Sequence, residues 1–380
     1  MTLVSGVQKM SNEEGWTSDA SFPVYDAPDG ADAMAVAEAA KKRGGLVVYV
    51  ARDAARAADM TSALEFFAPE IARLEYPAWD CLPYDRVSPS AAVSAQRMAA
   101  LSVLAKRAGD APLILVTTVN AATQRTPPKS LVESSAFRAR PGETVSMDRL
   151  VAYLVANGYA RASTVREAGE FAVRGGLVDL FPPGAEEPIR LDFFGDSLES
   201  IRGFDPVTQL TTRQLAQVNL SAATEALMTE ETIARFRAGF RAEFGAASDD
   251  PVYAAVSEGR KQAGMEHWLP LFYDGTSTFF DFAGRGLFIL EHLAEEAAAD
   301  RFAAIDDYYK ARAEDLAAPR PKNSEFAAPS YRPLKPAAMY LPEEEWRTSL
   351  DAVALRRLTP FSPPDDRRAF SFGAKVGRTF

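Results

Sequence analysis

Residues 166–205, REAGEFAVRGGLVDLFPPGAEEPIRLDFFGDSLESIRGFD, contain the clearest structural pattern of the chain. Apolar residues alternate with others over 170–174, Gly175-Gly176 interrupt the run, and residues 177–181 resume it. A period of two is typical of a half-buried strand, and paired glycines mark a bend. This part of the stretch therefore predicts two strand segments around a bulge or a tight bend.

A third apolar run follows at residues 189–194 and alternates strictly. Strand geometry places Arg190, Asp192 and Phe194 on one face, opposite three apolar side chains. Gly195-Asp196 is a two-residue hairpin signal, so the chain is expected to return as a partner strand. The stretch predicts a small antiparallel sheet with one buried face and one face that carries charges and an aromatic ring.

The combined pattern of the stretch is GEF-x-V-R-G-G-x-x-D-x-F-P-P-G, followed by P-x-R-x-D-F-F-G-D-x-x-E-S-I-R-x-F-D, over about forty residues. It resembles the UvrA-binding domain shared by the excision-repair protein UvrB and the transcription-repair coupling factors (Mfd). The resemblance implies that Arg174, Arg190 and Phe194 bind UvrA. It also implies that this domain is inserted into another.

The physical argument for these three residues rests on Phe194, because interfaces are enriched in aromatic rings and arginines. Arg190→Ala and Phe194→Ala are expected to weaken UvrA binding and to leave the fold nearly unchanged. The alternative is that Phe194 packs under a loop and that Arg174 and Arg190 form solvated ion pairs. Alternation alone does not decide between these interpretations.

Continuous apolar runs at 46–50 and 113–117 alternate with helical segments at 53–67 and 91–107, which predicts a parallel α/β layer. The resemblance implies a degenerate, split RecA-like domain with an inserted, smaller α+β domain. The expected divisions are 21–135 (first part of the α/β domain), 136–225 (UvrA-binding domain), 226–350 (second part of the α/β domain) and 351–380 (linker). Residues 1–20 are expected to be disordered, and 342–355 to be helical.

The loop before the alanine-rich helical segment 31–42 is where the family's nucleotide-binding relatives carry a phosphate loop. Here it offers Gly30, Ala31 and Asp32, with neither the lysine nor the hydroxyl that a phosphate loop requires. Asp26, Asp29 and Asp32 would repel a triphosphate. We expect no ATP binding, no cofactor and no enzymatic activity from this chain.

Residues 77–90, PAWDCLPYDRVSPS, resemble the W-x-x-L-P-Y-D-x-x-S-P segment of the coupling factors, and the tyrosine-rich DNA hairpin of UvrB has no counterpart. The resemblance therefore favours the UvrB-like N-terminal part of a coupling factor, which recruits UvrA to stalled RNA polymerase. The alternative is a UvrB-type ATP-dependent helicase. In the intact family members, other domains bind polymerase and duplex DNA, and the C-terminal domain covers the UvrA-binding surface.

Composition excludes several other classes of function. The net charge of −10 argues against nucleic-acid binding by the chain itself. A single cysteine, Cys81, and two histidines, His267 and His292, argue against a disulfide or a metal site. No apolar run has membrane-spanning length and no secretory signal is visible, so a cytoplasmic location without a membrane partner is expected.

Two further groups of residues are interpreted as structural. The carboxylate pairs Asp179/Asp192 and Glu343–Glu345 have no converging partner and are expected to be ordinary surface groups. The aromatic residues between Trp268 and Phe282 could form a stacking platform, but large aromatics are most often buried in a core.

Overall fold

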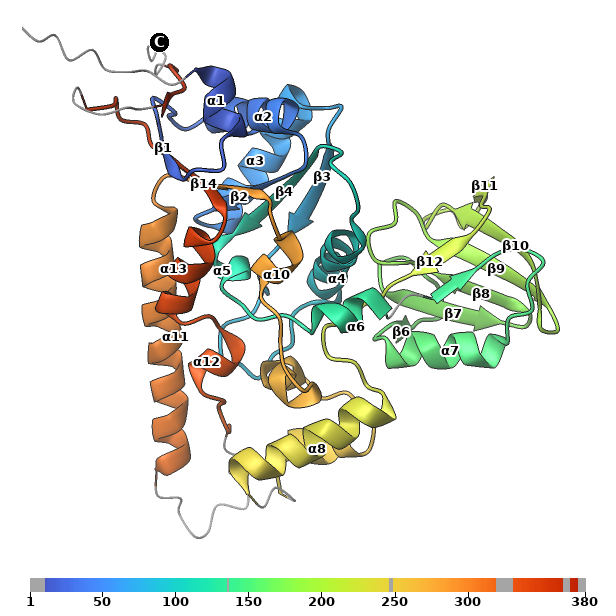
Figure 1. Cartoon of the computed structure of the whole chain (residues 1–380). Helices are drawn as coiled ribbons and strands as arrows, with labels where there is room; N and C mark the ends of the chain where they lie inside the picture. Colours follow the sequence, from blue (N-terminus) through green and yellow to red (C-terminus); the bar gives the residue numbers. More distant parts are fainter. Residues whose placement is uncertain (1–10, 135–136, 246–248, 319–330, 365–369, 375–380) are drawn as a thin grey trace, which may run out of the picture.

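The computed structural model describes residues 11–134, 137–245, 249–318, 331–364 and 370–374 of the 380-residue chain. They form a larger α/β unit and a smaller unit built on an antiparallel sheet, which lies at the right of Figure 1. The chain passes from the first unit into the second after α6 and returns from it before α8.

A seven-stranded parallel sheet forms the centre of the larger unit, in the order β15-β1-β14-β13-β2-β4-β3. Its strands are β1 (Phe22–Tyr25), β2 (Leu46–Ala51), β3 (Ala72–Tyr76), β4 (Leu113–Thr118), β13 (Leu287–Leu290), β14 (Ala354–Leu358) and β15 (Phe370–Ser371). The central strands β2, β4 and β13 are buried at every position. Such continuous apolar runs are typical of a parallel sheet covered on both faces.

Strand alternation divides the core of this unit between the two faces. Val47 and Tyr49 point into one apolar cluster, and Val48 and Val50 point into the other. The first cluster is completed by α1 (Asn12–Thr17), α2 (Asp32–Arg43) and α3 (Ala54–Phe67). The second is completed by α4 (Ala91–Lys106), α5 (Val119–Ala122), α6 (Lys129–Ser134), α10 (Phe279–Ala283), α11 (Ala294–Ala317) and α13 (Glu343–Asp351).

A third core cluster lies beyond the sheet, in the lower part of Figure 1, and is rich in aromatic side chains. It is built by α8 (Glu230–Phe244), α9 (Pro251–Ser257), the 3-10 helix η1 (Met265–Phe272) and α12 (Pro336–Met339). Trp268 and Phe272 are buried here, and Phe279, Phe280 and Phe282 are buried against the sheet. The interpretation of this aromatic segment as core is confirmed.

The smaller unit contains a six-stranded sheet in the order β11-β10-β9-β8-β7-β6, which is antiparallel except for the β6–β7 pair. Its elements are β6 (Ala160–Arg161), β7 (Glu170–Arg174), β8 (Leu177–Leu180), β9 (Ile189–Phe194), β10 (Ser197–Phe204) and β11 (Thr211–Gln214), with α7 (Met147–Ala156) and the ribbon of β5 (Phe137–Ala139) and β12 (Val218–Leu220). The predicted fold class, a parallel α/β domain with a smaller unit on an antiparallel sheet, is confirmed.

The two glycine turns predicted in this sheet are both present. Gly175-Gly176 joins β7 to β8 and Gly195-Asp196 joins β9 to β10, each as a two-residue turn. Gly175 and Gly195 have φ angles of 58° and 61°, a region that favours glycine. One face of the sheet is closed by α7 and the β5–β12 ribbon over a core that includes Leu191 and Phe193. The opposite face is called the outer face below.

A buried ion pair fastens the smaller unit to the larger one. Arg97 of α4 donates from Nε and Nη2 to the carboxylate of Glu225, at 2.9 and 3.0 Å, and both side chains are inaccessible to solvent. The indole of Trp79 donates to the same carboxylate at 2.6 Å, and Tyr76 accepts from Arg97 at 2.6 Å. Because these groups come from both units, their relative position is fixed by directional contacts.

Three expectations about the ends of the chain are wrong for the described residues. Residues 12–17 form helix α1, and Trp16 is fully buried against Phe370 with ring centroids 4.9 Å apart. The predicted helix 342–355 ends at Asp351, because the chain continues as β14. The region 351–380, expected to be a linker, contributes β14 and β15 to the parallel sheet, while 365–369 and 375–380 lie outside the described residues.

The reason for these differences is a contact between distant residues, which local composition does not reveal. The guanidinium of Arg356, fully buried in β14, donates to the carbonyl oxygens of Gly15, Ser18 and Ala20 at 2.6 to 2.7 Å. It also lies 3.9 Å from the centre of the Phe22 ring. Burial lowers the pKa of Arg356 to about 10. The carbonyl groups of Gly15 in α1 and of Ser18 and Ala20 just after it thus bind a buried cation, and this contact holds α1 against the sheet.

Candidate functional site

The outer face of the smaller unit brings Arg190 and Arg174 to one carboxylate. Asp179 of β8 lies opposite Arg190 of β9 in the register and shares its face. Arg190 donates to Asp179 from Nε at 2.6 Å and from Nη2 at 2.9 Å. Arg174 reaches the same carboxylate from β7, with Nη2 at 3.4 Å from Oδ2. Asp179 is 2% exposed, so the expectation that it is an ordinary surface group is wrong, and it is a buried anion with two arginines above it.

The two arginines differ in how much they present to solvent. The side chain of Arg174 is 49% exposed and that of Arg190 is 18% exposed. The guanidinium of Arg190 lies 4.8 Å from the centre of the buried Phe204 ring. Hydrogen bonding to Asp179 raises the pKa of Arg190. Arg190 is therefore held between a carboxylate and a ring, whereas Arg174 is available to a partner.

This geometry changes one expectation from the sequence. Truncation of Arg190 would leave Asp179 buried with only the weaker contact from Arg174, and removal of one partner of a buried pair is destabilising. Arg190→Ala is therefore expected to weaken the fold as well as any binding. Arg174 and Phe194 are the cleaner probes of the surface.

Phe194 lies at the end of β9, where it pairs with Ser197 across the hairpin. Its side chain is 82% exposed, so the alternative in which the ring packs under a loop is wrong. By alternation it shares the outer face with Asp192 and Arg190, and it lies about 13 Å from Arg190 along the strand. The exposed ring and the two arginines thus lie on one continuous surface.

The site at the carboxyl ends of the parallel strands has the opposite character. The loop before α2 holds Gly30, Ala31 and Asp32, and Gly30 has a φ of 90°. Asp32 Oδ1 accepts hydrogen bonds from the backbone N–H groups of Gly30, at 3.1 Å, and Ala33, at 2.9 Å. Backbone N–H groups at such a turn are the donors that a phosphate would use. Here a carboxylate of the chain itself occupies them.

The same carboxylate belongs to a closed network, which is called the strand-end network below. It consists of Asp32, Tyr49, Arg52, Arg56 and Glu291. Arg56 Nη2 donates to Asp32 Oδ2 at 2.6 Å, and its Nε donates to Glu291 Oε1 at 2.6 Å. Glu291 also accepts from the backbone and the side chain of Arg52, and Tyr49 donates to Asp32 at 3.1 Å. Asp32 and Glu291 are 6% and 4% exposed.

The pKa shifts in the strand-end network follow from burial and from these pairings. Burial and the negative charges of Asp32 and Glu291 raise the pKa of Tyr49. Burial lowers the pKa of Arg56, but its hydrogen bond to Glu291 and the charge of Asp32 outweigh this and raise it. Arg56 and Glu291 were not identified from the sequence. For Glu291 the available signal was its position directly after a buried parallel strand, whereas Arg56 lies within α3 and had no such signal.

Three further carboxylates singled out in the sequence have separate partners. Asp192 pairs with Arg202 at 2.9 Å rather than with Asp179. Glu343 pairs with Arg347, and Glu345 pairs with Arg125, both at 2.6 Å. A carboxylate held by an arginine is poorly suited to proton transfer, so these pairs do not form an acid–base site.

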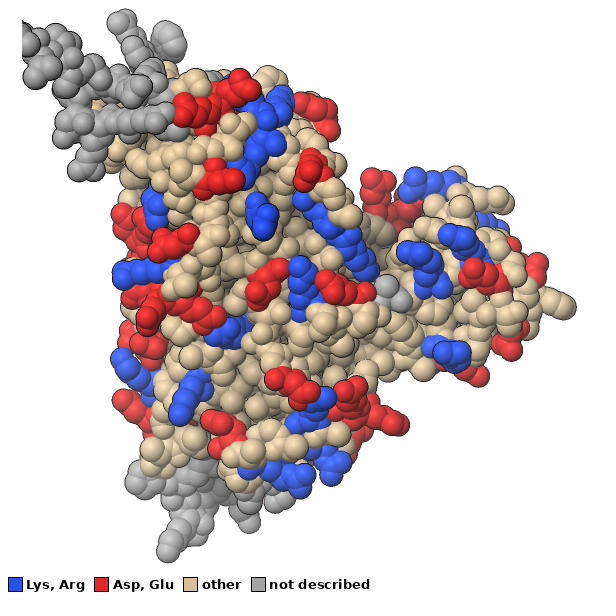
Figure 2. All heavy atoms as spheres, in the orientation of Figure 1, with Lys and Arg blue, Asp and Glu red and all other residues tan. Residues whose placement is uncertain are grey.

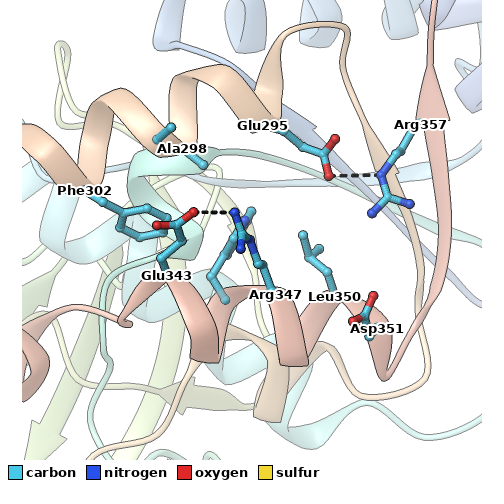
Figure 3. A pocket seen from close by; sticks show the side chains of 10 residues that line it. Glu295, Ala298, Phe302, Glu343, Arg347, Leu350, Asp351 and Arg357 are labelled. Atoms are coloured by element: carbon cyan, nitrogen blue, oxygen red, sulfur yellow. Dashed lines mark hydrogen bonds and ion pairs between the residues drawn. The ribbon is translucent and has the colours of Figure 1, made fainter.

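A cavity of about 390 Å³ lies between α11 and α13 and is shown in Figure 3. Four of its charged groups form two ion pairs, Glu343 with Arg347 and Glu295 with Arg357, at 2.6 and 3.0 Å. Phe302 and Leu350 line its apolar part. Four of its five charged side chains are thus neutralised in pairs, and Asp351 is a further carboxylate in its lining.

Metal ligation finds no support within the residues that the structure describes. No cluster of three metal-ligating side chains occurs among them. His267 is buried and its Nε2 lies 3.2 Å from the carbonyl oxygen of Val87 and 3.9 Å from Cys81 Sγ. His292 packs edge-on against Phe361. Within the same residues, no helix combines the length and the apolarity that crossing a bilayer demands.

Comparison with known proteins identifies relatives of this chain. Residues 137–225 match the family described as the UvrB interaction domain. The transcription-repair-coupling factor of Haemophilus influenzae is 34% identical over 275 residues, 72% of this chain and 24% of that protein. The coupling factor of Escherichia coli K12 is 33% identical over 274 residues, which are 72% of this chain and 24% of that protein. The coupling factor of Myxococcus xanthus is 38% identical over 250 residues, which are 62% of this chain and 20% of that protein.

These matches confirm the relationship that the pattern in residues 166–205 indicated. The chain spans about a quarter of the length of the curated relatives that it matches.

Proposed function

We propose that this chain, a relative of the transcription-repair-coupling factors with a UvrB interaction domain, binds UvrA through the outer face of its smaller unit and serves transcription-coupled repair. The observation that carries the proposal is Phe194, a phenyl ring that is 82% exposed on the same face as Arg174 and Arg190. An exposed ring beside arginines is the composition typical of an interface anchor.

The partner chemistry follows from the charges of this surface. Arg174 contacts Asp179 with one long hydrogen bond, at 3.4 Å, so its half-exposed guanidinium can donate to a carboxylate of the partner in a bidentate arrangement. Next to Arg174, the side chains of Arg190 and Asp179 form an ion pair that has no net charge. The aromatic ring contributes apolar area that the partner would cover.

The alternative of a UvrB-type ATP-dependent helicase is disfavoured by the strand-end network. A nucleotide phosphate at the N-terminus of α2 would have to displace the Asp32 carboxylate, which is held there by Arg56 and Tyr49. The negative charge of the Asp32 carboxylate would remain next to the phosphate. We therefore assign no nucleotide-dependent activity to this chain.

The wider role of the relatives is also a proposal for this chain. Contacts with RNA polymerase and duplex DNA, and coverage of the outer face by the protein's own C-terminal domain, would involve regions beyond the quarter of the relatives that is matched. The chain itself carries a net charge of −10. On the side shown in Figure 2, acidic and basic side chains are interspersed rather than gathered into a basic stripe, which gives DNA little to bind.

The proposal is tested by calorimetric titration of the chain with purified UvrA, followed by competition with UvrB. We expect saturable binding that UvrB displaces, because both proteins would use one UvrA surface. Phe66→Ala serves as a control, since Phe66 is also a highly exposed ring, 80%, but lies on α3 of the other unit. Absence of binding by the wild-type chain would overturn the proposal, and binding unaffected by UvrB would exclude a shared surface.

A further inference from the structure

The loop between β10 and β11 presents two neighbouring apolar side chains to solvent. Val207 is 86% exposed and Leu210 is 70% exposed. Single exposed apolar residues are common on protein surfaces and need no explanation. Here two of them lie three positions apart in one short loop.

The conformation of this loop is fixed by hydrogen bonds from its own polar residues. Asp205 Oδ1 accepts from the backbone N–H groups of Val207 and Thr208, at 3.0 and 2.6 Å. The backbone of Asp205 also bonds to that of Leu210, at 2.9 Å. Gln209 adopts a φ of 62° and donates from its amide to the carbonyl oxygen of Val165 at 3.3 Å. The loop is thus held in a conformation that leaves both apolar side chains uncovered.

The loop borders the same face as the two arginines. Ala172, Asp179 and Arg190 lie opposite one another on three adjacent strands and share the outer face. On this face Ala172 packs with Val165 and Phe204 in a small buried cluster, and Arg190 lies over the Phe204 ring. Phe204 directly precedes the loop, and the carbonyl oxygen of Val165 accepts the hydrogen bond from Gln209. The loop is therefore anchored on residues of the outer face.

We propose that Val207 and Leu210 form a second apolar contact for the protein that binds Arg174 and Phe194, at the opposite end of the outer face. The proposal rests on the proposed function, because it takes UvrA as the occupant. The partner surface that fits would have a carboxylate within reach of Arg174 and an apolar hollow for the loop.

The dimensions of the face are compatible with one interface. Phe194 lies about 17 Å along β9 from Ile189, which pairs with Gly203 just before the loop. A standard protein interface covers about 800 Å² on each partner, roughly 30 Å across. One partner can therefore cover Phe194 and the loop together. Because the loop is already ordered, little conformational entropy is lost when it is covered.

The test compares the double variant Val207→Ser/Leu210→Ser with wild type for UvrA affinity by calorimetry and for melting temperature. We expect a loss of affinity of about tenfold or more, with the melting temperature nearly unchanged because both side chains are exposed. Val207→Ser alone should lose part of this affinity. Phe66→Ser, on the other unit, should lose none.

Parallel measurement of Phe194→Ala separates this inference from the function on which it rests. If Phe194→Ala loses UvrA and the double loop variant binds within about twofold of wild type, the second contact is wrong and the proposed function stands. If the wild-type chain does not bind UvrA, both are wrong. Loss of affinity in the loop variant at an unchanged melting temperature supports the second contact.

Discussion

The strand-end network and the outer face both combine arginines with a buried carboxylate, but they use them in opposite ways. In the network, Arg56 is shared between Asp32 and Glu291, and the backbone donors of the α2 turn are occupied by Asp32. On the outer face, Arg190 neutralises Asp179, and Arg174 is left half exposed on the same face as Phe194. The first arrangement satisfies its charges internally, and the second retains groups for a partner.

The difference shows why a fold does not define a function. The parallel sheet places polar groups at the carboxyl ends of its strands, where α/β proteins bind ligands. In this chain those groups bind one another. The surface proposed for recognition is instead on the smaller unit, where Phe194 and the half-exposed Arg174 share one face.

The largest expected effect on stability is that of removing Arg56 from the strand-end network. Arg56→Ala would leave two buried carboxylates, Asp32 and Glu291, without their shared cation, at a cost of about 3 kcal/mol in the free energy of unfolding. Arg347→Ala is the matched control, because Arg347 is 73% exposed in its pair with Glu343 and should change stability by less than about 0.5 kcal/mol. Denaturant unfolding measures both.

A loss below about 1 kcal/mol for Arg56→Ala would mean that solvent reaches the two carboxylates when the guanidinium is removed. The strand-end network would then be a surface ion-pair cluster rather than a closed site. UvrA binding by the folded Arg56→Ala protein should be unchanged, since Arg56 and the outer face belong to different units.

An element of the fold could be predicted from the sequence where residues close together in the chain determine it. The strands at 46–50 and 113–117 were predicted because burial on both faces requires continuous apolar runs, and each is one residue longer in the structure. The β9–β10 hairpin was predicted because Gly195-Asp196 is a local turn signal. The strand β14 was missed because its polar residue Arg356 is stabilised by carbonyl oxygens more than 300 positions away.

The candidate sites show the same limit. Alternation placed Arg190 and Phe194 on one face, but it did not reveal that Arg190 binds Asp179 of the neighbouring strand. The pairing of Arg56 with Glu291 joins residues 235 positions apart, and no spacing rule connects them. Sequence patterns therefore predicted which side chains share a face, and the structure was needed to show which of them are already paired.

The second prediction concerns UvrA binding by the outer face. Phe194→Ala is expected to weaken UvrA binding by roughly thirtyfold, about 2 kcal/mol, while the melting temperature stays nearly the same. The ring is 82% exposed, so its removal costs the fold little. Arg174→Ala should behave in the same way with a smaller loss. Surface-immobilised UvrA with purified variants provides the affinities, and thermal unfolding provides the control.

Wild-type affinity in both variants would show that the partner does not use this part of the outer face. A fall in stability of about 3 kcal/mol for Phe194→Ala, as for a buried phenylalanine, would contradict the exposed position of the ring.

The third prediction uses pH to probe the core of the larger unit. Burial lowers the pKa of His267 to about 4, against about 6.5 in an unfolded chain. Between these values the unfolded state binds a proton that the folded state does not, so stability is full above pH 6.5 and falls as the pH falls toward 4. At pH 5 the expected loss from this group is about 2 kcal/mol.

His267→Gln should therefore show a smaller loss of stability between pH 7 and pH 5 than wild type does, whatever its stability at pH 7. His292→Gln is the control, because His292 is only half buried. Equal pH dependence in wild type and His267→Gln would show that His267 becomes protonated without unfolding.

The smallest expected effect is that of a nucleotide. A ligand that binds only the folded state stabilises it according to its concentration relative to its Kd, so 1 mM MgATP would add about 2.7 kcal/mol if the Kd were about 10 µM. Because Asp32 occupies the backbone donors at the turn, we expect a Kd above about 10 mM and a gain below about 0.1 kcal/mol. The melting temperature of the wild-type chain should not rise measurably with MgATP. Asp32→Ala sharpens the result: a rise confined to this variant would show that the carboxylate itself excludes phosphate, and a rise in wild type would contradict the closed state of the strand-end network.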